Sequence, residues 1–280
     1  VECLQPNTTY WVQVDGSGLN TEGFFGLRIA DDGIARATND DICSAINLGT
    51  MALGGTLTDN NMNNFCATIQ TGEPNSPGCI YAIDQTIWVQ FTTGANVGYE
   101  MTFESFSDPL SVGDNLDLQI AVYESSNGTC TGTLTEIDCD YVPDVPGFWV
   151  GEDLTVRCLD PNTTYFVQLD GSAINIEGYI GITITDDGIA RAPNDLICNA
   201  TPFGTIPDAG TTAFTNQNNY CGGIQAGEPD PLSHNIEQTV WYSFVPPTSG
   251  SVEIELLNTG ADDIDLQVSV WESSDNTCTG

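Results

Sequence analysis

Two groups of acidic and amide side chains in this sequence have the residue types and spacing that bind a hard cation. In each group an Asp-Asp-Gly triplet is followed a few residues later by an Asn-Asp pair. The candidate ligands are Asp31, Asp32, Asn39, Asp40, Asp186, Asp187, Asn194 and Asp195. Calcium is held by carboxylate, amide and carbonyl oxygens, so these residues predict calcium sites. The alternative is Asp-Gly turns and an N-cap whose carboxylates are solvated.

A second type of acidic cluster also occurs twice. Its members are Asp114, Asn115 and Asp117, and again Asp262, Asp263 and Asp265. None of these clusters has the residue spacing of an EF-hand loop. Any calcium site would therefore depend on how the fold brings separate residues together.

These groups recur because the chain repeats itself. Residues 3–41 match residues 158–196 at 26 of 39 positions, with an offset of 155. The expected division is 1–33 as the last strands of a preceding repeat, 34–187 as a complete repeat, and 188–280 as the first part of a following one. We expect a stretch of a longer array. The alternative is a polymer in which the first strands of one subunit complete the last domain of its neighbour.

Ten cysteines recur at fixed places in the repeat and predict disulfide bonds. A zinc site is disfavoured because the chain has no CxxC pair and a single histidine. Disulfides indicate an oxidising, secreted or extracellular setting. The expected pairs are Cys43–Cys66, Cys198–Cys221 and Cys130–Cys139, with Cys79–Cys158 assigned by elimination and Cys278 left without a partner.

Catalysis has little support in this sequence. The only histidine, His234, lies in a loop of the third copy and has no equivalent in the middle copy. A catalytic triad needs a base held by a second group, and a repeat built for catalysis should carry its base in each copy. We therefore expect no enzymatic activity. Sugar binding by tryptophans is an alternative, but four of the five lie in strand patterns typical of a core, and only Trp149 is a plausible exposed one.

The net charge of the chain excludes several classes of partner. The chain has four basic residues, all arginine, and 39 acidic residues, which gives a formal charge of −35. Such a chain is not attracted to nucleic acid or to anionic lipid. No apolar run approaches the length of about 18 residues that membrane insertion requires. Hydrophobic residues still make up 40% of the chain, so an acidic disordered tail is also excluded.

The elements that carry these residues are predicted to be short strands. β-Branched and aromatic runs separated by Gly, Asn, Asp, Ser and Pro predict an all-β fold of tandem antiparallel β-sandwich domains, jelly-roll-like and stapled by disulfides. The expected strands are 8–14, 23–29, 86–91, 99–103, 116–123, 240–245 and 252–256. A short helical turn after Asn39 or Asn194, capped by that Asn, is also expected. The links at 34–37 and 189–192 are short and predict a stiff string of domains.

Several motifs resemble one known family. They are the Asn39-Asp40 element, the strands around Trp88 and Trp241, the Ser-Gly turn at 249–252, the Asp-rich strands at 114–122 and 262–270, and the proline-containing turn at 161–167. Together they resemble tandem bacterial pre-peptidase C-terminal domains. Cysteine-bearing versions look like the repeats of large secreted cell-surface proteins of Bacteroidota, including giant adhesins of gliding cells. The resemblance implies a jelly-roll β-sandwich, secretion, and display or attachment.

The expected function is therefore structural. The chain is expected to be a non-enzymatic repeat segment of a large secreted cell-surface adhesin or extracellular filament. Its partners would be neighbouring repeats of the same chain or like subunits in a filament, and surface glycans are a further candidate. The alternatives are an array of carbohydrate-binding modules and an accessory region of a secreted hydrolase. No nucleic-acid partner and no membrane insertion are expected.

Overall fold

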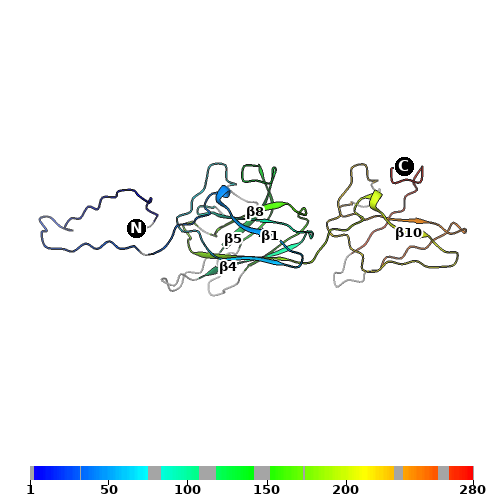
Figure 1. Ribbon diagram of the computed structural model, residues 1–280, viewed down its shortest axis with the longest axis horizontal. Coiled ribbons are helices and arrows are strands. Elements are labelled where there is room, and N and C mark those ends of the chain that lie inside the picture. Colours follow the sequence, from blue (N-terminus) through cyan, green and yellow to red (C-terminus); the bar gives the residue numbers. More distant parts are fainter. Residues whose placement is uncertain are drawn as a thin grey trace.

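The computed structural model describes residues 3–31, 33–74, 83–106, 118–141, 152–172, 174–229, 236–257 and 265–279. Figure 1 shows a central β-sandwich with another part of the chain on either side of it. The strands of this central sandwich lie between residues 46 and 186. Residues 3–31 form the N-terminal segment, and residues 192–279 form the C-terminal part. Among the described residues, no helix has the length and apolar character to cross a bilayer.

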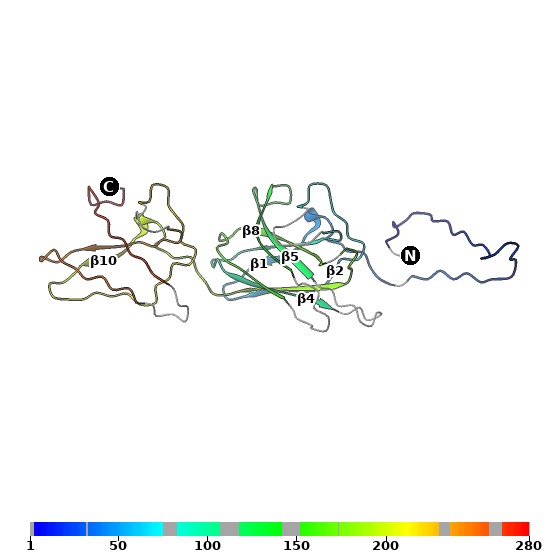
Figure 2. The same ribbon diagram turned by 180° about the vertical axis from the view of Figure 1, so that it is seen from behind.

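The central sandwich consists of two β-sheets. The five-stranded sheet has the spatial order β1 (Ile46–Thr50), β3 (Ile87–Thr92), β8 (Thr164–Gly171), β5 (Leu118–Ser125) and β6 (Leu134–Tyr141). The four-stranded sheet has the order β2 (Thr56–Asn63), β9 (Tyr179–Asp186), β4 (Tyr99–Phe106) and β7 (Glu152–Val156). Figures 1 and 2 show from opposite sides that β4 lies in one layer while β1, β5 and β8 lie in the other. The all-β sandwich predicted from the sequence is confirmed, with one parallel pair, β1 with β3, among antiparallel ones.

Strand β3 shows how the sequence builds this architecture. Successive side chains of a strand point to opposite faces of the sheet. Ile87, Val89 and Phe91 therefore face the four-stranded sheet and join the main core. Trp88 points to the other face and packs with Tyr123, and it is also 0% exposed. The five-stranded sheet is thus buried on both of its faces.

The C-terminal part begins like the central sandwich. Strands β10 (Thr201–Thr205) and β11 (Tyr242–Val245) form a parallel pair, as β1 and β3 do. Each pair is preceded by one turn of 3-10 helix, η1 (Ile42–Ser44) or η2 (Ile197–Asn199). The predicted helical turn therefore exists, but its N-cap is not an Asn. Asp41 caps η1 through a hydrogen bond from the Cys43 backbone N, and Leu196 precedes η2 without a side-chain bond.

Three predicted strands are absent from the structure. Residues 8–14, 23–29 and 252–256 are extended and exposed, but they pair with no neighbouring strand. The sequence repeat aligns 8–14 and 23–29 with β8 and β9, and 252–256 with β4. Each of these is an interior strand in its sheet, with a partner on both sides. The predictions were wrong here because strand propensity does not form a strand without flanking strands to hydrogen-bond.

The disulfide pairing also differs from the prediction. The bonds are Cys3–Cys66, Cys43–Cys130, Cys158–Cys221 and Cys198–Cys278, and Cys139 is disulfide-bonded as well. The expected pairs Cys43–Cys66, Cys198–Cys221, Cys130–Cys139 and Cys79–Cys158 are therefore wrong, as is an unpaired Cys278. The observed bonds join residues 63 to 87 positions apart. Short separation in the sequence was a poor guide because the sandwich brings distant loops to the same edge.

The tryptophans divide between the interior and the surface. Trp88 lies in the core as predicted, whereas Trp11 is 92% exposed and Trp271 is 46% exposed. Both exposed residues lie in segments that form no strand, so they have no second sheet to pack against. Trp149 and His234 lie outside the described residues.

Candidate functional site: the junctions between repeats

Two of the disulfides cross from one repeat of the sequence to the next. Cys158 follows β7 of the central sandwich, and its partner Cys221 belongs to the C-terminal part. Cys3 of the N-terminal segment is bonded in the same way to Cys66, which follows β2 of the central sandwich. Both bonds span 63 residues and both have Cα atoms 5.0 Å apart. The crossing bond is thus a regular feature of this repeat.

All four cysteines of these crossing bonds have an unusual backbone conformation. Their φ angles are 58° at Cys3, 56° at Cys66, 65° at Cys158 and 54° at Cys221. Non-glycine residues seldom occupy this left-handed region, and each instance costs on the order of 1 kcal/mol. The cysteines of the Cys43–Cys130 bond are not among the positive-φ residues. Among the cysteines of the four described disulfides, this geometry is confined to the two bonds that join repeats.

Arginine side chains hold the loops that carry these cysteines. Arg36 Nη2 donates to the backbone O of Cys66 at 2.8 Å. Arg191, its equivalent one repeat later, donates through Nη1 to the backbone O of Cys221 at 3.1 Å. Arg191 Nη2 also forms an ion pair with Asp160 Oδ1 of the central sandwich at 3.2 Å. Because the arginine lies within the link between repeats, it connects the link directly to the loop that carries the cysteine.

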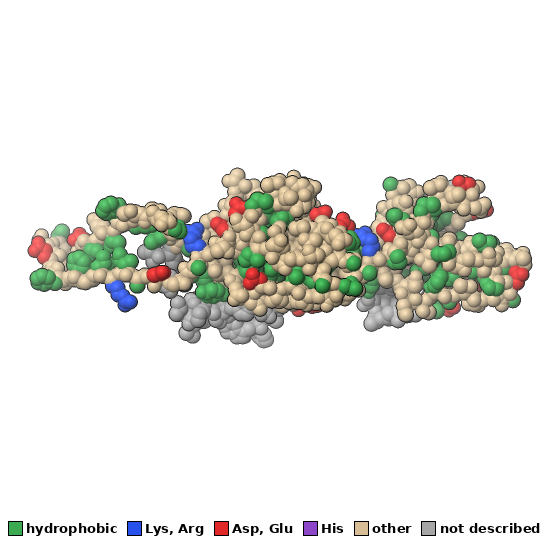
Figure 3. Space-filling view, viewed as in Figure 1, with side chains coloured by type: hydrophobic (Ala, Val, Ile, Leu, Met, Phe, Trp, Pro, Cys, Tyr) green, Lys and Arg blue, Asp and Glu red, His purple; other side chains and the backbone are tan. Residues whose placement is uncertain are grey.

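The remaining junction arginine comes from the central sandwich. The guanidinium of Arg157 lies 5.9 Å from the ring centroid of Tyr220, and its Nε lies 4.0 Å from Asp187 Oδ2. Exposed ion pairs contribute at most about 1 kcal/mol each, so these contacts orient the junction more than they stabilise it. Three of the four basic residues in the whole chain thus serve the junctions. Figure 3 shows basic side chains between the central sandwich and the parts on either side.

Backbone hydrogen bonds fix the link itself. Ile189 O accepts a bond from Val97 N of the central sandwich at 2.9 Å. Three residues later, Ala192 N donates to Tyr220 O in the C-terminal part at 2.9 Å. The link is therefore attached to both of the bodies that it joins. The stiffness of this connection stays a prediction.

The predicted calcium ligands at the junctions have separate hydrogen-bonding roles. Asn39 Nδ2 donates to Trp88 O at 2.9 Å, and Asn194 Nδ2 donates to Trp241 O at 2.9 Å. Asp40 Oδ1 accepts from Thr68 N at 2.6 Å, Asp195 Oδ1 accepts from Gly223 N at 2.6 Å, and Asp31 Oδ1 accepts from Gly33 N at 3.0 Å. Asp32 lies outside the described residues, as do Asp114, Asn115, Asp117, Asp262 and Asp263. Asp31 thus bonds within its own turn, whereas the other four described side chains each bond to the backbone of a segment distant in the sequence.

Asp186 and Asp187 support the turn that leaves the central sandwich. Asp186 accepts hydrogen bonds from Asn96 Nδ2 at 2.9 Å, Gly54 N at 2.7 Å and Gly188 N at 2.9 Å. Burial acts to raise the pKa of Asp186, but these hydrogen bonds outweigh it and lower the pKa below its usual value. Asp187 Oδ1 accepts from Ile189 N at 2.8 Å. Both carboxylates therefore hold the backbone at the start of the link.

The Asp186→Asn variant should lose acid-sensitive stability. Because the folded state depresses the pKa of this group, its contribution is present above the unfolded pKa of about 4 and is lost as the pH falls through the folded value. We expect the variant to melt a few degrees lower than the parent chain at pH 7. The gap should close below about pH 4, and melting curves between pH 2 and pH 7 would show it. A gap that stays constant over this range would contradict the assignment.

The structure does not gather the described members of this set into one coordination sphere. Within the described part of the chain, one group of three potential Cys, His or acidic ligands lies close together, namely Cys3, Cys66 and Glu177. The two sulfurs of that group form a disulfide, so they are not thiolate ligands. Calcium at the junctions stays a prediction, and it would have to use lone pairs that the backbone bonds leave free.

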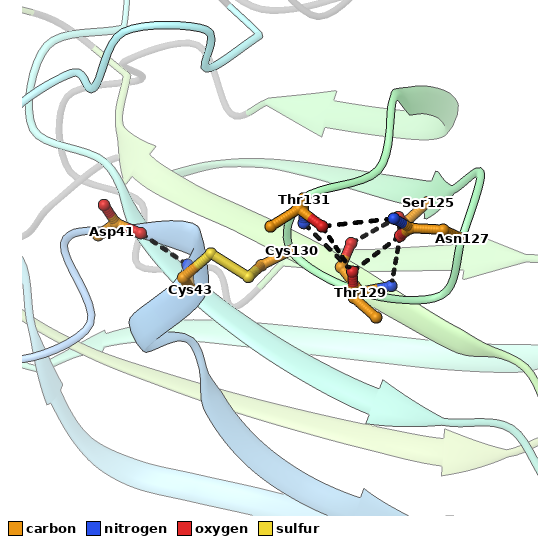
Figure 4. Close-up of a disulfide and its surroundings, with 7 residues drawn as sticks. All are labelled: Asp41, Cys43, Ser125, Asn127, Thr129, Cys130 and Thr131. Atoms are coloured by element: carbon orange, nitrogen blue, oxygen red, sulfur yellow. Dashed lines mark hydrogen bonds between the residues drawn. A yellow bond between two sulfur atoms is a disulfide. The ribbon is translucent and has the colours of Figure 1, made fainter.

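A second type of disulfide holds each repeat together internally. Cys43 of η1 is bonded to Cys130, which lies in the turn between β5 and β6, as Figure 4 shows. The turn is ordered by its own side chains: Asn127 Oδ1 accepts from Thr129 N at 2.9 Å, and Ser125 Oγ donates to Thr129 O at 2.6 Å. Cys198–Cys278 repeats this bond in the C-terminal part. Each of these bonds thus ties the 3-10 turn at the start of a repeat to the later segment that carries Cys130 or Cys278.

Sequence reasoning gave no role to Glu73, although the Gly-Glu-Pro motif recurs at 227–229. Its Oε1 accepts from Trp88 Nε1 at 3.1 Å, from Gln168 Nε2 at 2.9 Å and from the hydroxyl of Thr86. Its Oε2 accepts from the backbone N of Gln70 at 2.8 Å. This carboxylate therefore connects the loop after β2 to the outer face of the five-stranded sheet. The recurrence of the motif was the signal that could have identified it.

Comparisons with known proteins give little further guidance. No protein-family model matches this chain. No curated protein matches its sequence either. One solved structure that resembles it is the K1 cleaved adhesin domain of Lys-gingipain from Porphyromonas gingivalis W83. That match has 16% sequence identity and a TM-score of 0.25, and it covers 40% of this chain and 67% of the other. A likeness at this level carries no argument about the role of the present chain.

Proposed function

We propose that this chain is a non-enzymatic structural segment of a large secreted, adhesin-like surface protein or extracellular filament. In this proposal its repeats form a stiff acidic string that extends and withstands load. The observation that carries the proposal is the disulfide that crosses each junction, at Cys3–Cys66 and Cys158–Cys221. A protein whose neighbouring repeats are covalently joined beyond the backbone is suited to transmitting force. Its disulfides also favour an oxidising, extracellular setting.

The chemistry of the described residues supports a structural role. The arginines, acids and buried amides at the junctions all bond to loop backbone or to one another, as the contacts of Arg191 and Asp186 illustrate. The surface carries a large excess of negative charge, which keeps like chains apart and discourages unspecific association. The proposed partners are neighbouring repeats of the same chain, or like subunits if the native assembly is a filament.

Two other functions stay as alternatives to test. An array of carbohydrate-binding modules would use exposed aromatic residues, and binding to surface glycans that disappears on Trp149→Ala would favour it. An accessory role beside a secreted hydrolase would be favoured by a catalytic domain encoded next to this segment. The covalent junctions favour the mechanical role over both, because neither binding nor accessory function requires rigidly connected repeats.

The rigidity of the junction can be tested with paired cysteine variants of the chain. We expect the double variant Cys158→Ser with Cys221→Ser to bend at the link, and small-angle X-ray scattering should then show a broader distribution of shapes and a smaller average maximum dimension. The matched control is Cys43→Ser with Cys130→Ser, which removes a disulfide inside one repeat and should leave the inter-repeat angle unchanged. Equal scattering from the parent chain and the junction variant would contradict the proposal.

A further inference from the structure

A buried acidic side chain, a half-buried acidic side chain and a buried amide lie at one end of the five-stranded sheet. Gln119 of β5 lies directly opposite Asp170 of β8 in the antiparallel register, so both side chains leave the same face of the sheet. Gln119 Nε2 donates to Gly171 O at 2.7 Å, and Gly171 N donates to Asp170 Oδ1 at 2.8 Å. Asp84, which precedes β3, donates through its backbone N to Asp170 Oδ2 at 2.8 Å. These bonds bring the three residues around one point.

Several oxygens at this point have no hydrogen-bond donor. Gln119 is 0% exposed and Asp170 is 1% exposed. Gln119 Oε1, Asp84 Oδ1 and Gln85 Oε1 are all buried, and none of them has a hydrogen-bond partner. The amide of Gln119 cannot simply be reversed, because its Nε2 is already bonded to a carbonyl. A buried oxygen left without a partner costs about 1–3 kcal/mol, so three of them together call for a positive charge or a donor.

The charges at this site also favour a bound cation. The Asp84 and Asp170 carboxylates are close enough to repel each other, and the described residues around them supply no lysine, arginine or histidine. A cation between the two carboxylates would neutralise this repulsion and supply the missing partner of the amide oxygens.

The same types of side chain recur in the other copies of the repeat. The pair Asp84 and Gln85 stands four and three residues before Trp88, and Glu237 and Gln238 stand at the same distances before Trp241. Gln119 is matched by Gln267, and Asp170 is matched by Asp15. Acid is replaced only by acid and amide only by amide, although the loops of the two copies differ in length. Each of these positions therefore keeps a side-chain oxygen that could bind a cation.

We propose that Asp84, Gln119 and Asp170 bind a divalent cation of the calcium type inside the central sandwich. Asp84 Oδ1 and Gln119 Oε1 are the protein ligands with free lone pairs, Asp170 contributes charge and a remaining lone pair, and Gln85 Oε1 with water completes the sphere. Calcium accepts such mixed carboxylate, amide and water ligands in irregular geometry. This site differs from the calcium sites predicted at the junctions, because it shares no residue with them.

The test is calcium titration of the whole 280-residue chain after treatment with chelator, followed by calorimetry and by thermal melting. We expect calcium to raise the melting temperature of the parent chain by several degrees. The variants Gln119→Met and Asp84→Asn should each weaken calcium binding at least tenfold and reduce the shift. The first removes an oxygen at similar volume, and the second removes only charge and keeps the fold's hydrogen-bond acceptor.

The matched control is Asp195→Asn, which alters a junction acid and should leave the calcium-dependent shift intact. Absence of any calcium-dependent shift in the parent chain would overturn the proposal. A shift that survives both Gln119→Met and Asp84→Asn would overturn it as well. A shift abolished by Asp195→Asn alone would place the ion at the junction and would count against this site.

Discussion

Stretching this chain between Cys3 and Cys278 in an atomic force microscope should extend it to no more than roughly 270 Å while its disulfides are intact. After reduction, the same chain should extend to roughly 930 Å. The difference arises because the four disulfides carry load in series, so most of the backbone lies in closed loops that tension never reaches. The expected change is more than threefold and can be read directly from force–extension curves.

The upper limit of the length follows from the shortest covalent route that uses these four disulfides. Load passes from Cys3 across to Cys66, back along 23 residues to Cys43, and across to Cys130. It then follows 28 residues to Cys158, crosses to Cys221, returns 23 residues to Cys198 and crosses to Cys278. About 74 backbone residues bear load, against about 275 in the reduced chain. The disulfide of Cys139 can shorten this route but cannot lengthen it.

Removal of a single bond gives a graded control for this experiment. In the double variant Cys43→Ser with Cys130→Ser, the two crossing bonds alone would leave load to follow the 92 residues from Cys66 to Cys158. The limit set by the remaining crossing bonds then rises by roughly 140 Å, and the disulfide of Cys139 determines how much of that increase is realised. Equal extension of the parent chain before and after reduction would show that the crossing bonds do not carry load.

Replacing Glu73 by alanine should destabilise the central sandwich by about 3 kcal/mol or more, which corresponds to a melting temperature roughly 10 °C lower. The substitution leaves the indole N–H of Trp88 and the amide of Gln168 without their shared acceptor in a buried setting. Tyr123 is affected indirectly, because its hydroxyl donates to Gln168 Oε1 at 3.1 Å. Chemical denaturation followed by tryptophan fluorescence would measure the loss.

Two further variants make the Glu73 prediction specific. Glu73→Gln keeps one acceptor oxygen and should cost less than Glu73→Ala. Glu228→Ala removes the equivalent carboxylate of the C-terminal part, where Trp241 Nε1 has no hydrogen-bond partner to lose. Its effect should therefore be small. A loss for Glu228→Ala as large as that for Glu73→Ala would mean that the indole bond contributes little.

The sequence predicted strand positions correctly where a local strand pattern, bounded by turn residues, was enough to define the strand. The strands predicted at 86–91, 99–103 and 116–123 correspond to β3, β4 and β5 to within three residues at each end. Prediction failed at 8–14, 23–29 and 252–256 because an interior strand depends on partners that are distant in the sequence. Propensity describes a residue and its neighbours along the chain, whereas pairing depends on the whole sheet.

The candidate site was predicted only in part. The recurring cysteines and the short links indicated disulfides and stiffness, but not that Cys158 would reach across the link to Cys221. Such a bond depends on how two repeats meet end to end. The spacing of cysteines within one repeat does not predict that arrangement. The role of Arg191 was missed for the same reason, because its partners, Asp160 and Cys221, belong to different repeats.

The Cys158–Cys221 bond also changes what an enzyme that cuts peptide bonds can do to this molecule. A single cut anywhere between residues 159 and 220, including the link at 189–192, leaves the two flanking repeats attached through sulfur. Complete severance there needs a cut and a reductant together. In surroundings rich in proteases and poor in thiols, the string would accumulate nicks without losing its length.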